Sequence, residues 1–447
     1  MKDFWVKWSV LLLLVGMVSC RPDEIQLQPG GEEKTPEQGR QEVPLLEKLA
    51  HIEVVTDGGK AVDSKENKDY RPCSVTVDWL FDNARILDAR AQIRGRGNST
   101  WNWYPKKPYR IKLDESAAMV GLPANKDWVL LADYRDVTHM MNATGFYLAR
   151  ELGLPCANHI RWVTLSLNGE DIGLYALTEQ VEEGGNRVPL DANEGILLAL
   201  DLNDGPSEGP KGATDNFWSE VFGMAGAVKY PKDATKAQRD KVKTAFAELE
   251  AAIDGKDWEE IQELLDVDSM IHYIMIQEIM GNVEMDNGNS IRSGYIHRHD
   301  NKSKWVMGPL WDCDGGFSYN WGDMYDSWGW GHTYFENYKY LVFGSDPYRH
   351  AGAYGATAPD FFCRLFGIPA FVERYQARWK ETHTQLLEGL LDYLGEVDEL
   401  IGDYAKEDME RWGIRNYNYD TQVRGLMTWL ANRFNYLDGI VRNYPKK

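Results

Sequence analysis

The chain has 447 residues, 43% of them hydrophobic, and a formal net charge of −20. So acidic a chain offers no broad basic face, which argues against nucleic acid as a partner. The length is ample for a large hydrophobic core, in one elaborate domain or in two lobes.

The first twenty residues are typical of an export signal. Lys2 and Lys7 precede an apolar run that is too short to span a bilayer, so residues 1–20 are predicted to be a cleaved lipoprotein signal peptide. The small residue before Cys20 resembles a bacterial lipobox and predicts lipidation of that cysteine. Residues 21–50 are rich in Pro, Gly, Glu and Gln and predict a disordered tether. We therefore expect a monomer in the cell envelope, held on the outer membrane or cell surface only through its lipid anchor.

The rest of the chain changes from strand-like to helical patterning. Residues 89–114 predict a strand–loop–strand pair, residues 136–153 a helix, and residues 159–181 a hairpin that turns at Asn168-Gly169. Further helices are predicted over 233–255, over 268–282 and from Pro369 onward. This order predicts an α+β fold in one domain, 51–447, with a β-rich N-terminal lobe at about 51–203, a helical C-terminal lobe at about 234–447 and a cleft between them.

Basic residues are concentrated in two neighbouring stretches, RGRGNSTW and PKKPYRIKL. Gly95 and Gly97 would let backbone N–H groups approach an anion. The residues that would surround a phosphate are Arg94, Arg96, Asn98, Lys107, Arg110 and Lys112. The loop reads G-x-G-x-x-T and lacks the third glycine of the usual nucleotide loops, so by itself it equally fits a tight turn with solvated basic side chains.

A polar loop, NVEMDNGNS, spans residues 282–290 and follows the helix predicted over 268–282. Asp286 could accept a proton from a hydroxyl group, and Asn289 could ligate a metal ion through its amide oxygen. Asn-Gly and Asp also simply make turns, which is the alternative interpretation of this loop.

Two aspartates lie two positions apart in the segment KWVMGPLWDCDGGF. In a strand Asp312 and Asp314 would share a face, and Gly315-Gly316 would then turn the chain away. Two carboxylates with no histidine nearby favour Mg²⁺ or Mn²⁺ over zinc. Mg²⁺ held in this way normally keeps phosphate oxygens as its other ligands, and the basic stretches are suited to bind that phosphate. The alternative is a pair of caps at a strand end.

Four of these stretches, taken in order, resemble the spore-coat protein H (CotH) kinase family in its Bacteroides-type lipoprotein form. They are IRGRGNSTW with PKKPYRIKLD, KDWVLLADYRDVTHMMN, SLNGEDIGLYALTEQVE and GPLWDCDGGF, and the resemblance runs from about Ile52 to Trp379. It implies an atypical protein-kinase-like, two-lobed fold that binds ATP with Mg²⁺ and transfers phosphate to Ser or Thr of a protein substrate. It also implies that Asp312 is the metal-binding aspartate, that Asp286 is the catalytic aspartate, and that a strand carrying Lys107, Arg110 and Lys112 faces the phosphates.

Two departures from the family pattern leave alternatives open. The catalytic loop between Asn282 and Ser293 is longer than the usual N-x-D, so Glu284 competes with Asp286 for the role of base. The aromatic segment 318–360 extends past the metal motif, where it could cover the cleft. A lipoprotein outside the inner membrane also meets little ATP. The alternatives are therefore a cell-surface protein that binds a glycan or protein ligand on an inactive kinase-like scaffold, a different phosphoryl donor, or a glycosyltransferase that uses the D-x-D pair.

Overall fold

The structure, a computed structural model, describes residues 48–206, 208–285, 291–319, 334–343 and 359–444. The predictions for the signal peptide, for Cys20 and for nearly all of the tether lie outside the described residues. So do Asp286, Asn289 and much of the aromatic segment 318–360. Among the described helices, none combines the length and the apolar character needed to cross a membrane.

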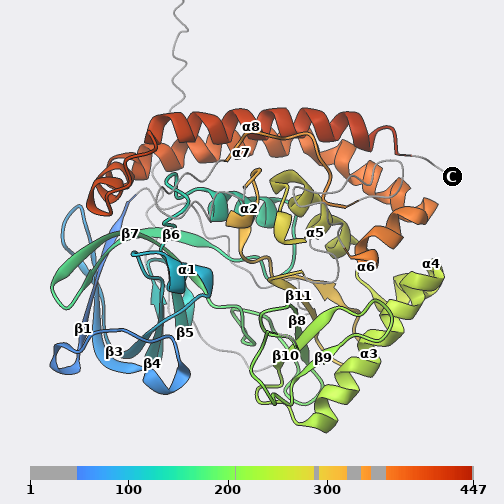
Figure 1. Ribbon diagram of the computed structural model, residues 1–447, viewed down its shortest axis with the longest axis horizontal. Helices are drawn as coiled ribbons and strands as arrows, with labels where there is room; N and C mark the ends of the chain where they lie inside the picture. The colour runs from blue at the N-terminus through green and yellow to red at the C-terminus, as the bar shows by residue number, and fades with distance from the viewer. Residues whose placement is uncertain (1–47, 207, 286–290, 320–333, 344–358, 445–447) are drawn as a thin grey trace, which may run out of the picture. The chain divides into compact units, whose positions relative to one another are not determined.

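Seven strands close into a barrel in the N-terminal part of the chain (Figure 1). In spatial order they are β1 (Ala50–Thr56), β2 (Arg71–Trp79), β3 (Arg85–Gly95), β4 (Tyr109–Met119), β5 (Leu122–Leu131), β7 (Glu170–Glu179) and β6 (Ile160–Leu167). All neighbours are antiparallel except β1 and β6, which pair in parallel and close the barrel. Alternate side chains of each strand, such as Ile52 and Val54 of β1, fill the barrel interior.

A second, five-stranded sheet follows, and its strands carry the loops of the site. Its order is β12 (Val306–Met307), β11 (Gly294–Arg298), β8 (Ile196–Leu200), β10 (Ala225–Tyr230) and β9 (Asn216–Trp218), all antiparallel. Gly294 pairs with Leu200, and Ile296 pairs with Met307. The end of β8, the start of β11 and the end of β12 therefore meet at one edge of the sheet.

The helices lie mainly in the C-terminal half. They are α1 (Ser99–Trp103), α2 (Met141–Glu151), α3 (Lys236–Gly255), α4 (Trp258–Leu264), α5 (Val267–Met280), α6 (Asp360–Cys363), α7 (Pro369–Arg411) and α8 (Tyr419–Val441). Short 3-10 turns are η1 (Asp57–Gly59), η2 (Asn67–Asp69), η3 (Val283–Met285), η4 (Cys313–Gly315) and η6 (Arg364–Gly367). The long helices α7 and α8 pack side by side, α7 against α2 and α8 against α5 (Figure 1).

The predicted hairpin and the predicted α+β order are confirmed, with two corrections. The hairpin joins β6 to β7 through Asn168 and Gly169, both at positive φ. The helix predicted from residue 136 begins only at Met141, because the Asp136 side chain instead accepts hydrogen bonds from the backbone of Thr138 and Met141. The β-rich part is a closed barrel, which differs from the N-terminal lobe of ordinary protein kinases.

A buried charge pair ties the C-terminal helices to the barrel. Asp408 of α7 accepts a hydrogen bond from the Lys106 ammonium at 2.7 Å and another from the backbone N–H of Leu174 at 3.0 Å. A Cβ on Gly173 would lie 2.0 Å from Asp408 Oδ1, so only glycine allows this approach. Breaking such a pair from one side leaves a buried charge without its partner, which is strongly destabilising.

Candidate active site

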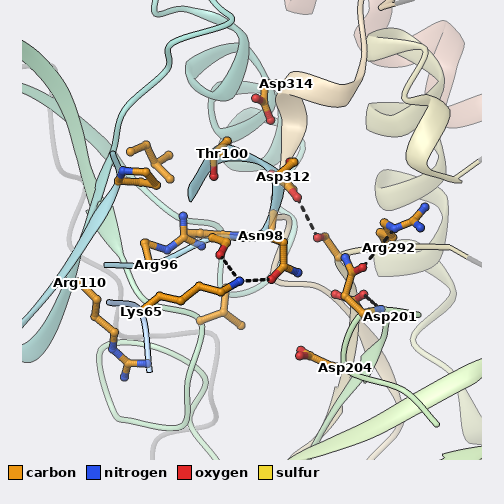
Figure 2. Close-up of a pocket in the computed structure, with 18 of the residues that line it drawn as sticks. Lys65, Arg96, Asn98, Thr100, Arg110, Asp201, Asp204, Arg292, Asp312 and Asp314 are labelled. Atoms are coloured by element: carbon orange, nitrogen blue, oxygen red, sulfur yellow. Dashed lines mark hydrogen bonds between the residues drawn. The ribbon is translucent and has the colours of Figure 1, made fainter. Parts of the chain in front are cut away.

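A cleft of about 940 Å³ lies between the barrel and the edge of the second sheet. The barrel contributes the loop that follows β3, and the second sheet contributes the residues after β8, before β11 and after β12. Basic side chains, among them Lys65, Arg96 and Arg110, come from the barrel, whereas Asp201, Asp204 and Asp312 come from the other wall (Figure 2). Lys229, Lys232 and Arg292 also line the second wall, which nevertheless carries more acidic than basic side chains.

The two glycines of the loop after β3 serve the packing of the loop itself. A Cβ on Gly95 would lie 2.1 Å from the ring of Trp101. Gly97 has a φ of +82°, and a Cβ there would lie 2.4 Å from Thr100 Oγ1. The backbone N–H groups of Gly95 and Arg96 already donate to Ser64 and Pro108. These two N–H groups are therefore already used, and any contact of Arg96 with an anion falls to its side chain.

The predicted basic residues do not all face the cleft. Arg94, Arg96 and Arg110 line it, together with Asn98. Lys107 instead donates to the carbonyl oxygen of Trp101 at 2.6 Å, and Lys112 lies exposed on the outside of β4. Neither of these lysines is among the residues that line the cleft.

The arginines that line the cleft also differ in how many hydrogen bonds and ion pairs they already form within the protein. Arg110 is paired with Asp127 at 2.6 Å and with Glu182 at 3.6 Å. Arg94 donates to the carbonyl oxygens of Lys65 and Gly95. Arg96, by contrast, forms no ion pair with any residue the structure describes, and its guanidinium lies 5.3 Å from the centre of the Trp311 ring. Burial lowers the pKa of Arg96, and the negative charge of Asp312 opposes that shift.

Lys65 is a lining residue that the sequence analysis missed. Its ammonium donates to the carbonyl oxygen of Gly97 at 2.9 Å and to Asn98 Oδ1 at 2.8 Å (Figure 2). It lies on the connection between β1 and β2, outside every motif, and the barrel brings it beside the loop after β3. No local sequence pattern would have identified it.

The two aspartates do not share a strand, and that part of the prediction is wrong. Asp312 has left-handed backbone angles (φ 61°, ψ 58°) and precedes the 3-10 turn η4. Residues 312–315, which form the aspartate turn, nevertheless place Asp312 and Asp314 in the wall of the cleft. Asp312 Oδ2 accepts a hydrogen bond from Ser293 Oγ at 3.0 Å. Burial, and then the charge of Asp314, raise the pKa of Asp312 to about 6.

Glu284 is a buried acid beside this turn. It lies in η3, is 9% exposed and lines the cleft. A Cβ on Gly315 would lie 2.8 Å from Glu284 Cγ, so the side chain packs against the aspartate turn. Glu284 Oε2 has no hydrogen-bond partner among the described residues. Burial, followed by the charges of Asp312 and Asp314, raises its pKa well above the usual glutamate value. A buried carboxylate oxygen without a partner is costly and often marks a functional position.

The CotH kinase protein family model matches residues 93–437 of the chain. The chain belongs to the CotH kinase family. No curated protein sequence matches it. The match covers the cleft walls from Arg94 to Asp314 and continues beyond the expected end at Trp379, so that it includes nearly all of α7 and α8. It begins at residue 93 rather than at the expected Ile52, so Lys65 and the strands β1 and β2 lie outside it.

The oxygen ligands of the aspartate turn suit a hard cation in this CotH family member. Asp312, Asp314 and Glu284 offer only carboxylate oxygens to a cation. The sulfur of Cys313 is not available, because it packs against Gly145 of α2, where a Cβ atom would lie 2.3 Å from Cys313 Sγ. Among the described residues, no three His, Cys, Asp or Glu side chains are grouped closely enough to enclose a metal ion. A cation here would thus be held by one or two carboxylates and completed by other oxygens, as is usual for Mg²⁺.

Asp201 holds the start of β11 in place, and the sequence analysis missed it as well. Its carboxylate accepts a hydrogen bond from the backbone N–H of Asn203 at 2.8 Å, and the nearby backbone N–H of Ser293 helps to lower its pKa against the effect of burial. Ser293 has a positive φ of 56°, and its hydroxyl group binds Asp312. Asp201 thereby helps to orient Asp312. A signal for it exists in the sequence, since it directly follows the buried strand ILLAL.

The described aromatic residues after the aspartate turn pack inward. Tyr319 is fully buried and Tyr340 is 6% exposed. The Arg433 guanidinium donates to the carbonyl oxygen of Tyr340, and Glu278 accepts hydrogen bonds from the backbone N–H groups of Val342 and Phe343. In the part of this segment that the structure describes, these residues therefore belong to the core rather than to an exposed aromatic surface that could bind a glycan.

Proposed function

We propose that this family member binds a nucleoside triphosphate with Mg²⁺ or Mn²⁺ in the cleft and transfers the terminal phosphoryl group to a Ser or Thr hydroxyl of a protein. The observation that carries the proposal is the position of Arg96 and of the Asp312–Asp314 turn on one cleft. Beside the turn lies Glu284, whose Oε2 atom has no hydrogen-bond partner among the described residues. Membership of the CotH kinase family supports the same reaction class, and with it a kinase-like, two-lobed organisation of residues 51–447.

Each wall of the cleft has a role in this proposal. Arg96 and Lys65 would bind phosphate oxygens from the barrel side, because charged donors bind phosphate strongly. Asp312 and Asp314 would hold the cation, with Asn289 as the predicted amide ligand. A bound Mg²⁺ ion supplies neutralisation of the phosphate charge. A volume of about 940 Å³ lies within the range of small-molecule sites and leaves room for a nucleotide.

We assign the proton acceptor to Glu284, with Asp286 as the alternative. In the transfer step the acceptor oxygen bonds to the terminal phosphorus, and the bond from that phosphorus to the bridging oxygen breaks. The hydroxyl proton passes to the carboxylate, and the nucleoside diphosphate leaves. Glu284 is favoured because it lines the cleft and packs on the aspartate turn. Asp286 lies outside the described residues, and its role stays a prediction.

A phosphorylation assay tests the reaction class. The purified protein is incubated with ATP labelled in its terminal phosphate, with Mg²⁺ or Mn²⁺, and with a mixture of Ser- and Thr-containing peptides. We expect label in the peptides or in the protein itself, and mass spectrometry then locates it. Because the chain is predicted to lie outside the cytoplasm, where ATP is scarce, other phosphoryl donors are assayed in parallel. No transfer from any donor with either metal ion would contradict the proposal and favour an inactive binding scaffold, which titrations with oligosaccharides and sugar nucleotides would then characterise.

Replacement of Arg96 by alanine should weaken nucleotide binding by about 10- to 100-fold, because a hydrogen bond to a charged group contributes roughly 1.5–3 kcal/mol. Isothermal titration calorimetry with ATP and Mg²⁺ measures this change. Lys112→Ala is the matched control, since Lys112 belongs to the same predicted basic set but lies exposed, outside the residues that line the cleft. A loss of affinity in Lys112→Ala as large as that in Arg96→Ala would contradict the assignment.

A further inference from the structure

Arg135 lines the cleft beside the aspartate turn and contacts one of the two acids of that turn. The Arg135 Nη2 atom is 2.8 Å from Asp314 Oδ2. Only 4% of the Arg135 side chain and 11% of the Asp314 side chain are exposed. A bond of this kind in a buried position is directional, because the guanidinium group is planar and its donors have a fixed geometry.

The loop that carries Arg135 is held in one conformation. Asp136 caps the start of α2, accepting hydrogen bonds from the backbone N–H groups of Thr138 at 3.0 Å and Met141 at 2.7 Å. The guanidinium group of Arg135 lies 4.5 Å from the centre of the Tyr319 ring, so an aromatic face supports it as well. Both the backbone next to Arg135 and its side chain therefore have supporting contacts within the protein.

The same stretch of chain also contacts the residue between the two aspartates. Asn142 Oδ1 accepts a hydrogen bond from the backbone N–H of Cys313 at 3.0 Å. Gly145 leaves room for the Cys313 side chain, since a Cβ there would lie 2.3 Å from Cys313 Sγ. Residues 135–145 thus touch Cys313 and Asp314 at three points, which suits a segment that orients the turn.

We propose that Arg135 is a positioning residue that fixes the Asp314 carboxylate, engaging Oδ2 and leaving Oδ1 for a divalent cation. This inference rests on the proposed function, because it takes the aspartate turn as the cation site. Groups that orient metal ligands commonly affect metal affinity by about 10- to 100-fold when they are replaced.

The sign of the effect separates positioning from simple electrostatics. Arg135 places a positive charge close to the site, so on electrostatic grounds alone its removal should strengthen cation binding. If Arg135 instead positions Asp314, its removal lets that carboxylate rotate and weakens cation binding. Arg135→Met removes the charge and the directional bonds but keeps a long, buried side chain.

The test is the affinity of the purified protein for Mn²⁺ alone, followed by electron paramagnetic resonance without nucleotide. We expect Arg135→Met to bind Mn²⁺ about 10-fold more weakly than the wild type. Unchanged or tighter binding would overturn the proposal. Wild-type protein that binds no Mn²⁺ would overturn the cation site and this inference together, whereas wild type that binds Mn²⁺ but transfers no phosphate would overturn only the proposed reaction.

Two further variants keep the test decisive if Arg135→Met does not fold. Arg135→Lys retains the charge but not the planar fork, so it should bind Mn²⁺ more weakly than the wild type and more tightly than a folded Arg135→Met. Asp314→Asn removes the carboxylate that Arg135 contacts. If Arg135 acts through Asp314, adding Arg135→Lys to Asp314→Asn should cause no further loss of affinity, and an additive loss would contradict the proposal.

Discussion

Asp312→Asn should lower the kcat/KM of phosphoryl transfer by about 10²- to 10³-fold or more. Asp312 is the residue at which the parts of the site meet. The hydroxyl group of Ser293 donates a hydrogen bond to the Asp312 carboxylate at 3.0 Å. The charge of Asp312 opposes the lowering of the Arg96 pKa and raises the pKa of Glu284. Asparagine keeps the shape of the side chain but removes the negative charge. Transfer is measured with labelled ATP, and nucleotide binding by calorimetry.

The same variant should be at least as stable as the wild type above about pH 6. The folded-state pKa of Asp312 is raised to about 6, so the folded protein holds this proton more tightly than the unfolded chain does. The stability that this group contributes is therefore present at low pH and is lost as the pH rises through about 6. Asparagine does not ionise, so it avoids that loss. Thermal unfolding at about pH 8 compares the two proteins, and a large drop in Tm would mean that lost activity reflects misfolding.

Asp268→Asn is the control for this substitution. Asp268 lies on α5, is 55% exposed on its side chain and pairs with Arg374 at 2.6 Å, outside the residues that line the cleft. An exposed ion pair of this kind contributes little to stability, so activity and Tm should both stay close to the wild-type values. An Asp312→Asn variant that transfers phosphate as fast as this control would contradict the assignment of Asp312.

Local patterns in the sequence predicted the elements better than their closure into a barrel. Asn168-Gly169 predicts its hairpin because both residues adopt positive φ readily. The parallel pair that closes the barrel joins Ala50 to Val163. Nothing near either residue encodes a pairing over such a distance, because it depends on the packing of all the intervening strands.

Site residues that lie together in one sequence motif were predictable. Site residues that the fold brings together from separate segments were less so. Asp312 and Asp314 were identified from their own segment, although their turn was not. Arg110 and Lys112 both point away from the barrel interior, but only Arg110 lies where the cleft passes. Which outer positions a cleft covers is decided by the neighbouring sheet, so alternation along β4 could not distinguish them.

Glu284 shows a signal that was present in the sequence and not used. It precedes Asn289 by five positions, which is the spacing from the catalytic aspartate to the metal-binding asparagine in the kinase pattern H-R-D-x-x-x-x-N. Asp286 precedes Asn289 by only three. The spacing agrees with the position of Glu284 in the wall of the cleft.

Glu284→Gln should lower kcat by about 10²- to 10⁴-fold and leave the affinity for ATP with Mg²⁺ nearly unchanged, because glutamine fills the same space but accepts no proton. Asp286→Asn is the matched comparison and should change kcat far less. The reverse result, with kcat lost in Asp286→Asn and retained in Glu284→Gln, would assign the base to Asp286. Single-turnover transfer and calorimetry separate the effect on chemistry from the effect on binding.

The pH dependence of kcat gives an independent check on Glu284. Its pKa lies well above the usual glutamate value because the side chain is buried and because Asp312 and Asp314 are close. Only the ionised carboxylate accepts a proton, so kcat should rise with pH over a range above that in which an exposed glutamate ionises. In the metal-free protein, removing a neighbouring negative charge should lower this pKa, so the Glu284 carboxyl group of Asp314→Asn should titrate at lower pH than that of the wild type when its ionisation is followed by NMR. A Glu284 titration that stays in place in Asp314→Asn would contradict the effect of Asp314 on this pKa.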